Sequence, residues 1–350
     1  MNVSDFDFAL PDSLIAQEAR PRGQSRLIVV RRATADWEER SMAELPELLA
    51  PGDLLVVNDT RVIPARLLGR RDPSGGAAEC LLVQRNDEVH WQALVHPGQK
   101  LKPGSRLIFE DAMRAPGVRL HADVLVQRFF GRRLLRFEVE GAATVDAAIE
   151  KLGHVPLPPY IRRPDTAADR ERYQTVYARV PGSIAAPTAG LHFDAPLLAS
   201  IEARGIGRAA ITHHVGYGTF KPVRVERVED HHVDAEAYEI PDDAASRIVA
   251  TKRAGGRIVA VGTTTTRALE SAAGEQGAFA ATAGTTERFI YPGHRFQVVD
   301  ALVTNFHLPR SSLLMLVAAF AGRDLILSAY RDAIARGVRF YSYGDAMLIL

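Results

Sequence analysis

The feature that most constrains the fold is a change in the secondary-structure pattern along the chain. Residues 62–140 contain short β-rich runs at intervals of about 8–12 residues, separated by glycine and proline residues. This pattern is typical of a small antiparallel barrel or sandwich. After about residue 143, helix and strand patterns alternate, which predicts an α/β layer structure. We therefore predict a discontinuous α/β domain, residues 1–61 and 151–350, with a small antiparallel β-barrel domain inserted as residues 62–150.

Composition restricts the class of protein further. The chain has 350 residues, of which 47% are hydrophobic and 24% are charged, as in a soluble folded protein. Its longest apolar run, Leu313–Ala321, is far shorter than the about 20 residues of a membrane span. The N-terminus lacks the basic and apolar regions of a secretory signal. Because Cys80 is the only cysteine, an intrachain disulfide and a thiolate-cluster metal site are excluded. We expect a cytoplasmic monomer without membrane association.

The predicted barrel is the basic part of a nearly neutral chain. Residues 61–140 contain 14 lysines and arginines and 9 aspartates and glutamates, whereas the net charge of the whole chain is +1. A basic segment is suited to contact nucleic-acid phosphate. The same charges are also expected on the solvated exterior of a barrel, so the charge distribution leaves both interpretations open.

A long segment with many prolines, residues 157–194, follows the predicted barrel domain. Ordinary connections have about 4–6 residues, and much longer ones are usually functional or disordered. The tyrosines and other large apolar residues of this segment argue against disorder. Arginines alternate with tyrosines up to Arg179, which predicts contact with a ligand that has anionic and planar groups. The small residues at 185–190 predict a turn whose backbone lies close to a ligand.

Four threonines, Thr263–Thr266, separate a strand predicted at residues 257–261 from a helix predicted at residues 266–273. Free N–H groups and hydroxyls at a helix start attract a carboxylate or a phosphate. Ordinary threonine capping is the alternative interpretation. Since no G-K-[ST] sequence follows the strand, this turn is not a nucleotide-triphosphate loop.

Three more polar turns are predicted at strand ends, where α/β sheets bind ligands. The turn at residues 58–61 follows a strand predicted at residues 54–57. The turn at 304–309 begins where the strand predicted at 300–304 ends, and the turn at 341–345 overlaps the end of the strand predicted at 338–343. An Asx turn would also explain the first of them. One further strand is predicted at residues 286–291.

Adjacent His213 and His214 end a strand predicted at residues 207–213. Successive residues of a strand point to opposite faces, so these two histidines cannot bind one metal together. We expect one of them to face a site and the other to pack. Because the chain lacks the histidine spacings of zinc sites, we expect no metal.

Several long segments resemble one family of tRNA-modifying enzymes, the S-adenosylmethionine:tRNA ribosyltransferase-isomerases. The matching segments are NDTRVIPARL (58–67), LPPYIRRPD (157–165), RYQTVYARVPGSIAAPTAGLHFD (172–194), THHVGYGTFKPV (212–223), VGTTTTRALES (261–271), FIYPGHRFQVVDALVTNFHLPRSSLLMLVAAFAG (289–322) and FYSYGDAMLI (340–349). The resemblance begins at residues 5–17 and is weakest over about residues 68–140.

The resemblance implies a reaction and a fold. Such an enzyme moves the ribosyl portion of S-adenosylmethionine onto 7-aminomethyl-7-deazaguanine at the wobble position of a tRNA. The ribose becomes an epoxycyclopentanediol, which gives epoxyqueuosine and releases adenine and methionine. S-adenosylmethionine is consumed as a substrate, so no cofactor is implied. The alternatives are a non-catalytic RNA-binding module with a degenerate S-adenosylmethionine pocket and a metabolic enzyme that uses S-adenosylmethionine on a small molecule.

The implied chemistry selects candidate residues. A first step would remove a C5′ proton that the sulfonium acidifies, and a neutral histidine or a carboxylate can accept it near pH 7. The candidates for this role are His192, His213, His214, His307, Asp59 and Asp345. The candidates for contact with S-adenosylmethionine are Thr188, Gly190, Gly216, Gly218, Thr219, Gly262, Thr263, Thr264, Thr265, Arg267 and Tyr343. The candidates for contact with tRNA, through phosphate and base stacking, are Arg61, Tyr160, Arg162, Arg163, Arg172, Tyr173 and Tyr177.

The chain departs from the family pattern at two positions. Tyr217 lies between Gly216 and Gly218 where the pattern usually has alanine, and Asp234 lies where a histidine is usual. Asp234 is therefore not among the candidate bases, and Tyr217 is expected to reshape the glycine turn.

Overall fold

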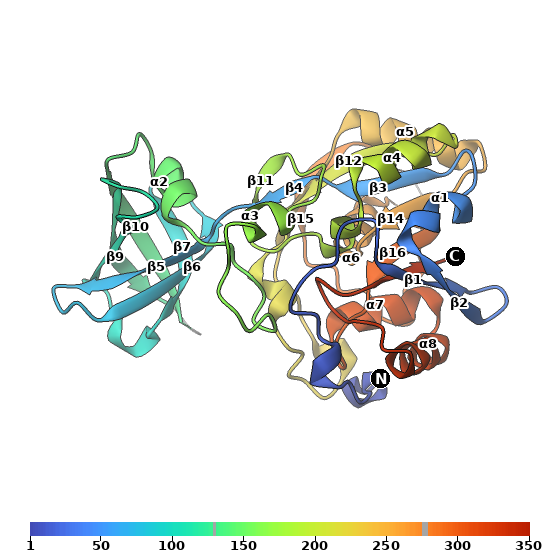
Figure 1. Cartoon of the computed structure of the whole chain (residues 1–350), viewed down its shortest axis with the longest axis horizontal. Coiled ribbons are helices and arrows are strands. Elements are labelled where there is room, and N and C mark those ends of the chain that lie inside the picture. Colours follow the sequence, from blue (N-terminus) through green and yellow to red (C-terminus); the bar gives the residue numbers. More distant parts are fainter. Residues whose placement is uncertain (129–130, 275–278) are drawn as a thin grey trace. The chain divides into compact units, whose positions relative to one another are not determined.

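The computed structural model describes residues 1–128, 131–274 and 279–350, which form two compact units. The α/β unit comprises Met1–Arg61, Pro159–Arg163 and Arg172–Leu350, and the barrel unit comprises Val62–Pro158 and Pro164–Glu171. Both ends of the chain therefore lie in the α/β unit (Figure 1). The barrel unit continues beyond residue 150, where we predicted the inserted domain to end.

Within the described residues, the α/β unit is built on a nine-stranded sheet of order β15-β13-β12-β3-β14-β16-β17-β1-β2. Its strands are β1 (Arg26–Arg31), β2 (Asp36–Ser41), β3 (Leu54–Asn58), β12 (Gly207–His213), β13 (Glu236–Ile240), β14 (Ile258–Val261), β15 (Thr282–Thr286), β16 (Ala301–Asn305) and β17 (Ala346–Ile349). The pairs β12–β3, β3–β14, β14–β16 and β17–β1 are parallel, and the other pairs are antiparallel.

The central strands form because continuous apolar runs can be buried on both faces of a sheet. Every residue of β3 and of β14 is buried. Alternate residues of β1 contribute to different cores. Ile28 and Val30 pack with helices within residues 242–335, whereas Leu27 and Val29 pack with helices at residues 45–48 and 195–203. Helices thus cover both faces of the sheet, which confirms the predicted α/β class.

The helices of the α/β unit connect these strands (Figure 1). They are α1 (Leu45–Leu48), α4 (Ala195–Ala203), α5 (Asp242–Arg253), α6 (Thr263–Ala272), α7 (Ser312–Ala321) and α8 (Arg323–Ala335), with the short 3-10 helices η1 (Val3–Phe6), η2 (Asp12–Leu14), η3 (Met42–Glu44), η5 (Thr188–His192), η6 (Tyr217–Phe220) and η7 (Val228–Asp230). In the described residues no single helix is long and apolar enough to cross a membrane. The pair α7 and α8 has the length and composition of a span but is bent by 115°.

Two predicted strands are wrong in position. The last strand is β17, after the turn at residues 341–345, whereas residues 338–343 form an isolated bridge and a turn. Tyr341 has a φ of 73°, in the left-handed region, so the chain cannot remain extended there. Strand β15 likewise precedes the predicted range 286–291, because its weakly patterned sequence TAGTT pairs with β13 at the edge of the sheet.

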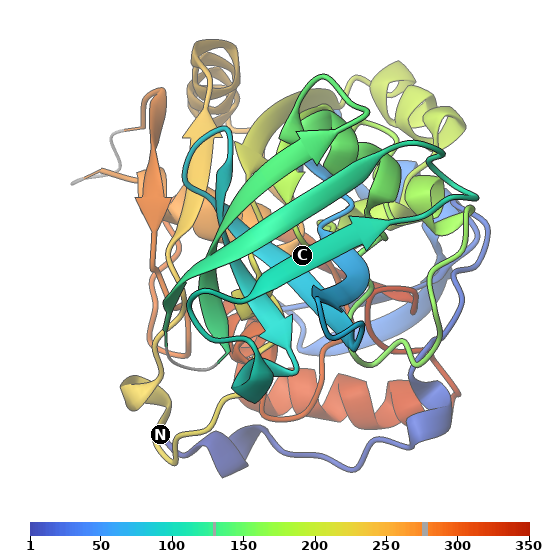
Figure 2. The same ribbon diagram turned by 90° about the vertical axis from the view of Figure 1, so that its left-hand side faces the viewer.

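The barrel unit contains, in its described residues, a closed antiparallel barrel of order β10-β7-β6-β5-β8-β9 (Figure 2). Its strands and helices are β5 (Arg66–Asp72), β6 (Ala77–Arg85), β7 (His90–His96), β8 (Arg106–Glu110), β9 (Arg119–Gln127), β10 (Arg132–Glu140), η4 (Gly98–Lys100) and α2 (Val145–Leu152). Three short elements, β4 (Thr60–Val62), β11 (Val180–Ser183) and α3 (Asp169–Arg172), complete the chain. One apolar side of α2 packs into the core of the barrel through Ala148 and Ile149, and the predicted β-barrel is confirmed.

Ion pairs occupy much of the barrel surface. Arg70 and Arg119 both bond to Glu110, at 2.8 and 2.7 Å, and Arg106 bonds to Glu138 at 2.8 Å. Arginines that are paired with carboxylates are partly neutralised. Arg70, Arg106 and Arg119 therefore belong to a solvated, ion-paired barrel exterior.

Candidate active site

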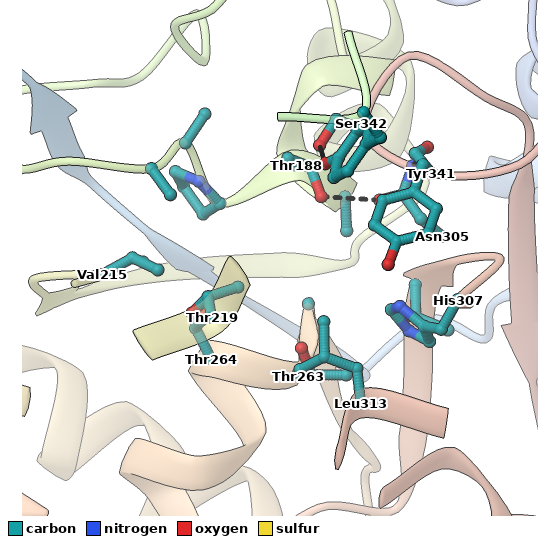
Figure 3. A pocket seen from close by; sticks show the side chains of 17 residues that line it. Thr188, Val215, Thr219, Thr263, Thr264, Asn305, His307, Leu313, Tyr341 and Ser342 are labelled. Atoms are coloured by element: carbon teal, nitrogen blue, oxygen red, sulfur yellow. Dashed lines mark hydrogen bonds between the residues drawn. The ribbon is translucent and has the colours of Figure 1, made fainter. Parts of the chain in front are cut away.

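A pocket lies in the α/β unit beside the ends of β14 and β16. Its open space, counted together with the adjoining solvent, is about 550 Å³. Seven of the predicted site residues line this first pocket: Tyr160, Thr188, Thr219, Gly262, Thr263, Thr264 and His307 (Figure 3). Segments far apart in the sequence thus meet at the edge of the sheet where we predicted ligand turns.

The threonine turn has the predicted geometry. Gly262 has a φ of 94°, so a residue with a side chain would be strained there, and α6 begins directly after it. Thr263 and Thr264 line the pocket, and the buried hydroxyl of Thr264 has no hydrogen-bond partner among the described residues. A buried hydroxyl without a partner costs free energy that a bound ligand would recover. Thr265 does not contribute, because its buried hydroxyl donates to the carbonyl of Val261 at 2.6 Å.

His307 is the one candidate histidine among the described residues that lines the pocket. It follows β16, and its Nε2 lies 2.9 Å from the hydroxyl of Thr304. Desolvation by burial lowers the pKa of His307 to about 3. The imidazole is therefore neutral at pH 7, which is the state that can accept a proton.

Asn305, which we did not predict, connects two sides of the pocket. Its amide nitrogen donates to His192 Nε2 and to the carbonyl of Tyr341, both at 3.0 Å. Its amide oxygen accepts from the hydroxyl of Thr188 at 3.1 Å, the dashed line to Thr188 in Figure 3. Its place at the end of a predicted strand is the only signal that the sequence offers. Asn305 therefore holds Thr188 and Tyr341 in place.

His192 lies behind Asn305 rather than in the pocket lining. Because an amide nitrogen can only donate, His192 Nε2 must accept, and Nδ1 carries the proton beside the hydroxyl of Ser25 at 2.7 Å. Desolvation by burial, with the nearby charges of Arg172 and Arg339, lowers the pKa of His192 to about 3. Both ring nitrogens have partners within the protein, so the geometry argues against our prediction that His192 transfers a proton.

Two tyrosines form an aromatic wall of the pocket. The rings of Tyr160 and Tyr341 lie 3.9 Å apart between centroids and are inclined by 53°, and the hydroxyl of Tyr160 is bonded to that of Ser342. Burial raises the pKa of both phenols, which are therefore neutral. Tyr160 was predicted to contact tRNA, but the structure places it against this pocket.

A buried polar cluster lies next to the pocket. His213 Nδ1 is 2.8 Å from the carbonyl of Thr264, and its Nε2 is 3.0 Å from Glu236 Oε2. The same carboxylate oxygen accepts from Arg267 Nη1 at 2.7 Å, and Glu236 Oε1 accepts from the backbone N–H of Gly216 at 2.7 Å. Burial opposes the charge on Glu236, but the bonds from His213 and Arg267 lower its pKa below the usual value. His213 thus packs within this cluster, as one of the two adjacent histidines was expected to do.

Three other candidate residues, His214, Gly190 and Tyr343, have contacts within the protein. His214 is half-buried beside the hydroxyl of Thr60 at 2.8 Å, and desolvation lowers its pKa. It lines neither of the two pockets described for the α/β unit. A side chain on Gly190 would meet the hydroxyl of Tyr177 at 2.3 Å, so this glycine permits packing of the loop. Tyr343 is buried against Tyr173.

The two candidate acids support the backbone. Asp345 is fully buried, and its carboxylate accepts from the backbone N–H groups of Arg26 and Arg339 at 3.1 and 2.9 Å. Asp59 is also buried, and it accepts from Thr212 at 2.7 Å and from Arg179 at 2.8 Å. A carboxylate with these partners is placed to stabilise the fold, and neither acid lines the pocket.

The residues predicted to contact tRNA differ in how exposed they are. Tyr173 is fully buried, so it cannot stack on a base in this conformation. Tyr177 is partly exposed, but its hydroxyl is buried. Arg172 donates to two backbone carbonyls, and burial lowers its pKa to about 10. Arg61 and Arg162, by contrast, are exposed. Arg163 lies between these extremes, with Nε donating to the carbonyl of Gln17 at 3.3 Å.

The fold and the pocket define a class of α/β protein with a pocket, lined by hydroxyl, amide and aromatic side chains, at the strand ends of its sheet. Comparison with known proteins narrows this class. The model of the family described as "Queuosine biosynthesis protein" matches residues 3–349. The chain therefore belongs to this family.

Relatives that match over the full length of both chains agree with this assignment. The S-adenosylmethionine:tRNA ribosyltransferase-isomerases of Symbiobacterium thermophilum and Halothermothrix orenii are each 52% identical to this chain over 100% of both sequences. The S-adenosylmethionine tRNA ribosyltransferase from Thermotoga maritima is 40% identical in sequence to this chain. Its crystal structure matches the structure of this chain with a TM-score of 0.56. The match covers 99% of this chain and 100% of that chain.

Proposed function

We propose that this protein is a tRNA-modifying transferase-isomerase. It transfers the ribosyl portion of S-adenosylmethionine to 7-aminomethyl-7-deazaguanine at the wobble position of tRNA and isomerises it to give epoxyqueuosine, with release of adenine and methionine. The observation that carries the proposal is the full-length similarity to relatives with this name, at about half of all positions. The pocket supports it, because seven residues selected from the family motifs line that single site.

In this proposal His307 is the base. The sulfonium acidifies the C5′ protons of the ribosyl group, and a neutral imidazole in the pocket can remove one of them. If His307 Nε2–H donates to Thr304, then Nδ1 presents its lone pair to the substrate. Removing the proton turns the sulfonium into a neutral ylide and the imidazole into a cation, so charge is conserved.

The pocket also offers groups that suit the rest of the substrate. The ring faces of Tyr160 and Tyr341 can contact the sulfonium or the adenine. The hydroxyls of Thr188, Thr263 and Thr264 can bond to the ribose and the base. We further propose that Arg61, Arg162 and Arg163 contact tRNA phosphates and that the protein acts in the cytoplasm as a monomer.

The test is adenine release. The protein is incubated with S-adenosylmethionine and a tRNA that carries 7-aminomethyl-7-deazaguanine, and adenine is followed by chromatography. Release that requires this tRNA supports the proposal. Binding of S-adenosylmethionine and tRNA without release would instead indicate the non-catalytic alternative, and turnover without tRNA would indicate a small-molecule enzyme.

A further inference from the structure

We propose that a second pocket of the α/β unit is an α-amino-acid subsite, in which Arg267 binds the α-carboxylate of the methionyl end of S-adenosylmethionine. This inference rests on the proposed function. The open space of the second pocket, counted together with the adjoining solvent, is about 420 Å³, and the pocket shares two lining residues, Thr219 and Leu313, with the first. One ligand with two chemically different ends can therefore occupy both pockets.

The first argument is the hydrogen bonding of Arg267. This arginine extends from α6, its side chain is only 10% exposed, and it lines the second pocket. Its Nη1 donates to Glu236 at 2.7 Å and its Nε donates to the carbonyl of Arg288 at 3.0 Å. Its Nη2 is buried and has no hydrogen-bond partner among the described residues. Leaving a buried cationic donor without a partner is costly, and a carboxylate is the group that a guanidinium binds best.

The second argument is the local charge. His213 is flanked by two acceptors, the carbonyl of Thr264 at 2.8 Å and the Glu236 carboxylate at 3.0 Å. Both ring nitrogens must donate to satisfy these bonds, so the ring is an imidazolium. Two buried cations, His213 and Arg267, then share the single carboxylate of Glu236. The cluster carries one positive charge in excess, and an anion beside Arg267 would balance it.

The third argument is the rest of the lining, which distinguishes an amino acid from a phosphate. The carboxylates of Asp234 and Glu236 line the same pocket and offer acceptors for an α-ammonium. A phosphate carries more negative charge than a carboxylate and has no ammonium group to pair with these acids. Ile290 and Leu316 offer apolar surface for the methylene groups between the sulfonium and the amino acid. Together, these side chains complement a zwitterion on a short apolar chain.

The subsite also gives meaning to one departure from the family pattern. Asp234, which lies where a histidine is usual, accepts from Lys221 at 2.6 Å and lines this pocket. The departure therefore changes a group that faces the amino-acid end of the substrate, away from His307, which lines only the first pocket.

The experiment compares S-adenosylmethionine with decarboxylated S-adenosylmethionine, which keeps the sulfonium and the adenosine but lacks the carboxylate. Dissociation constants are measured by calorimetry for the wild type, R267Q, R267K and R247Q. Arg247 is an exposed arginine on α5 that bonds to the carbonyl of Arg208, so R247Q is the matched control. We expect the wild type and R247Q to bind the decarboxylated compound about 10- to 100-fold more weakly, the effect of one charge-assisted hydrogen bond.

In R267Q the two compounds should bind with similar constants, and R267K should retain part of the preference. Equal binding by the wild type would overturn the inference, as would an R267Q variant that keeps the full preference. The wild-type comparison decides the question alone if R267Q does not fold. The proposed function has a separate readout: a wild type that prefers the carboxylate but releases no adenine with tRNA refutes that function and leaves the subsite in place.

Discussion

Replacement of His192 tests whether this histidine positions the pocket or transfers a proton. His192 accepts a hydrogen bond from Asn305, and Asn305 holds the hydroxyl of Thr188 and the carbonyl of Tyr341. In H192Q the side-chain oxygen can take the place of Nε2 and accept from Asn305, but it cannot act as a base near pH 7. In H192L the volume is similar and the acceptor is lost.

The expected losses of stability and of activity follow from the hydrogen bonds of His192 that each variant removes. In H192L one N–H of Asn305 and the hydroxyl of Ser25 lose their buried partner. Each loss costs about 1–3 kcal/mol, so the free energy of unfolding should fall by about 2–6 kcal/mol. H192Q keeps the bond to Asn305 and should lose about half as much. Because Asn305 sets the positions of Thr188 and Tyr341, kcat/KM should fall about 10- to 100-fold in H192L and less than about tenfold in H192Q.

The assay is tRNA-dependent adenine release between pH 5.5 and 9, combined with urea unfolding of the same samples. S25A, which removes only the outer bond of His192, serves as the control and should lose about 1 kcal/mol of stability with near-normal turnover. The positioning role requires H192Q to retain activity with the pH profile of the wild type. If H192Q folds as the wild type does and is as inactive as H192L, His192 is the base and our reasoning is wrong.

The remaining predictions concern the base, the stability at low pH and the tRNA contacts. H307N should abolish adenine release and leave the dissociation constant of S-adenosylmethionine within about threefold, and near-normal turnover would exclude His307 as the base. Burial lowers the pKa of both His192 and His307 to about 3, below the about 6.5 of an unfolded chain. Their contribution to stability is therefore present above pH 6.5 and is lost as the pH falls toward 3. The free energy of unfolding should drop by about 2 kcal/mol per histidine between pH 7 and pH 5, and H192Q should show a correspondingly smaller drop in urea titrations. R162A should weaken tRNA binding and reduce its salt slope by about 0.7–0.9, whereas R247A should leave the slope unchanged in filter-binding assays at several salt concentrations.

Local sequence patterns predicted the layers of the fold. The buried runs of β3 and β14 have no alternation, and that alone indicates strands covered on both sides. The regular spacing of short strands indicated the barrel in the same way. Strand β13, sequence EAYEI, was missed because two glutamates among its five residues leave no run and no strict alternation of apolar residues. This strand is important for the site, because it carries Glu236 of the buried polar cluster.

Tertiary contacts decided which motif residues reach the pocket. His192, His213 and His307 are equal in sequence terms, yet His192 lies behind Asn305, His213 is enclosed by Glu236 and Thr264, and His307 lines the pocket. Tyr173 lies among alternating arginines and tyrosines, which predicted that it stacks on an RNA base. In the structure it is fully buried. Local spacing predicts which face of an element a side chain lies on, and it contains no information on what covers that face.

The fold class, the inserted barrel and the edge of the sheet where ligand turns gather could all be predicted from local sequence patterns. These properties depend on periodicity and on turn residues, which act over a few positions of the chain. The partners of the polar side chains, by contrast, depend on tertiary contacts. The bond between Asn305 and His192 joins residues 113 positions apart, and the bond between Arg267 and Glu236 joins two different elements. Such partners are set by the order of strands in the sheet and by burial, so the distinction between a base, a positioning residue and a binding residue emerges only from the folded chain.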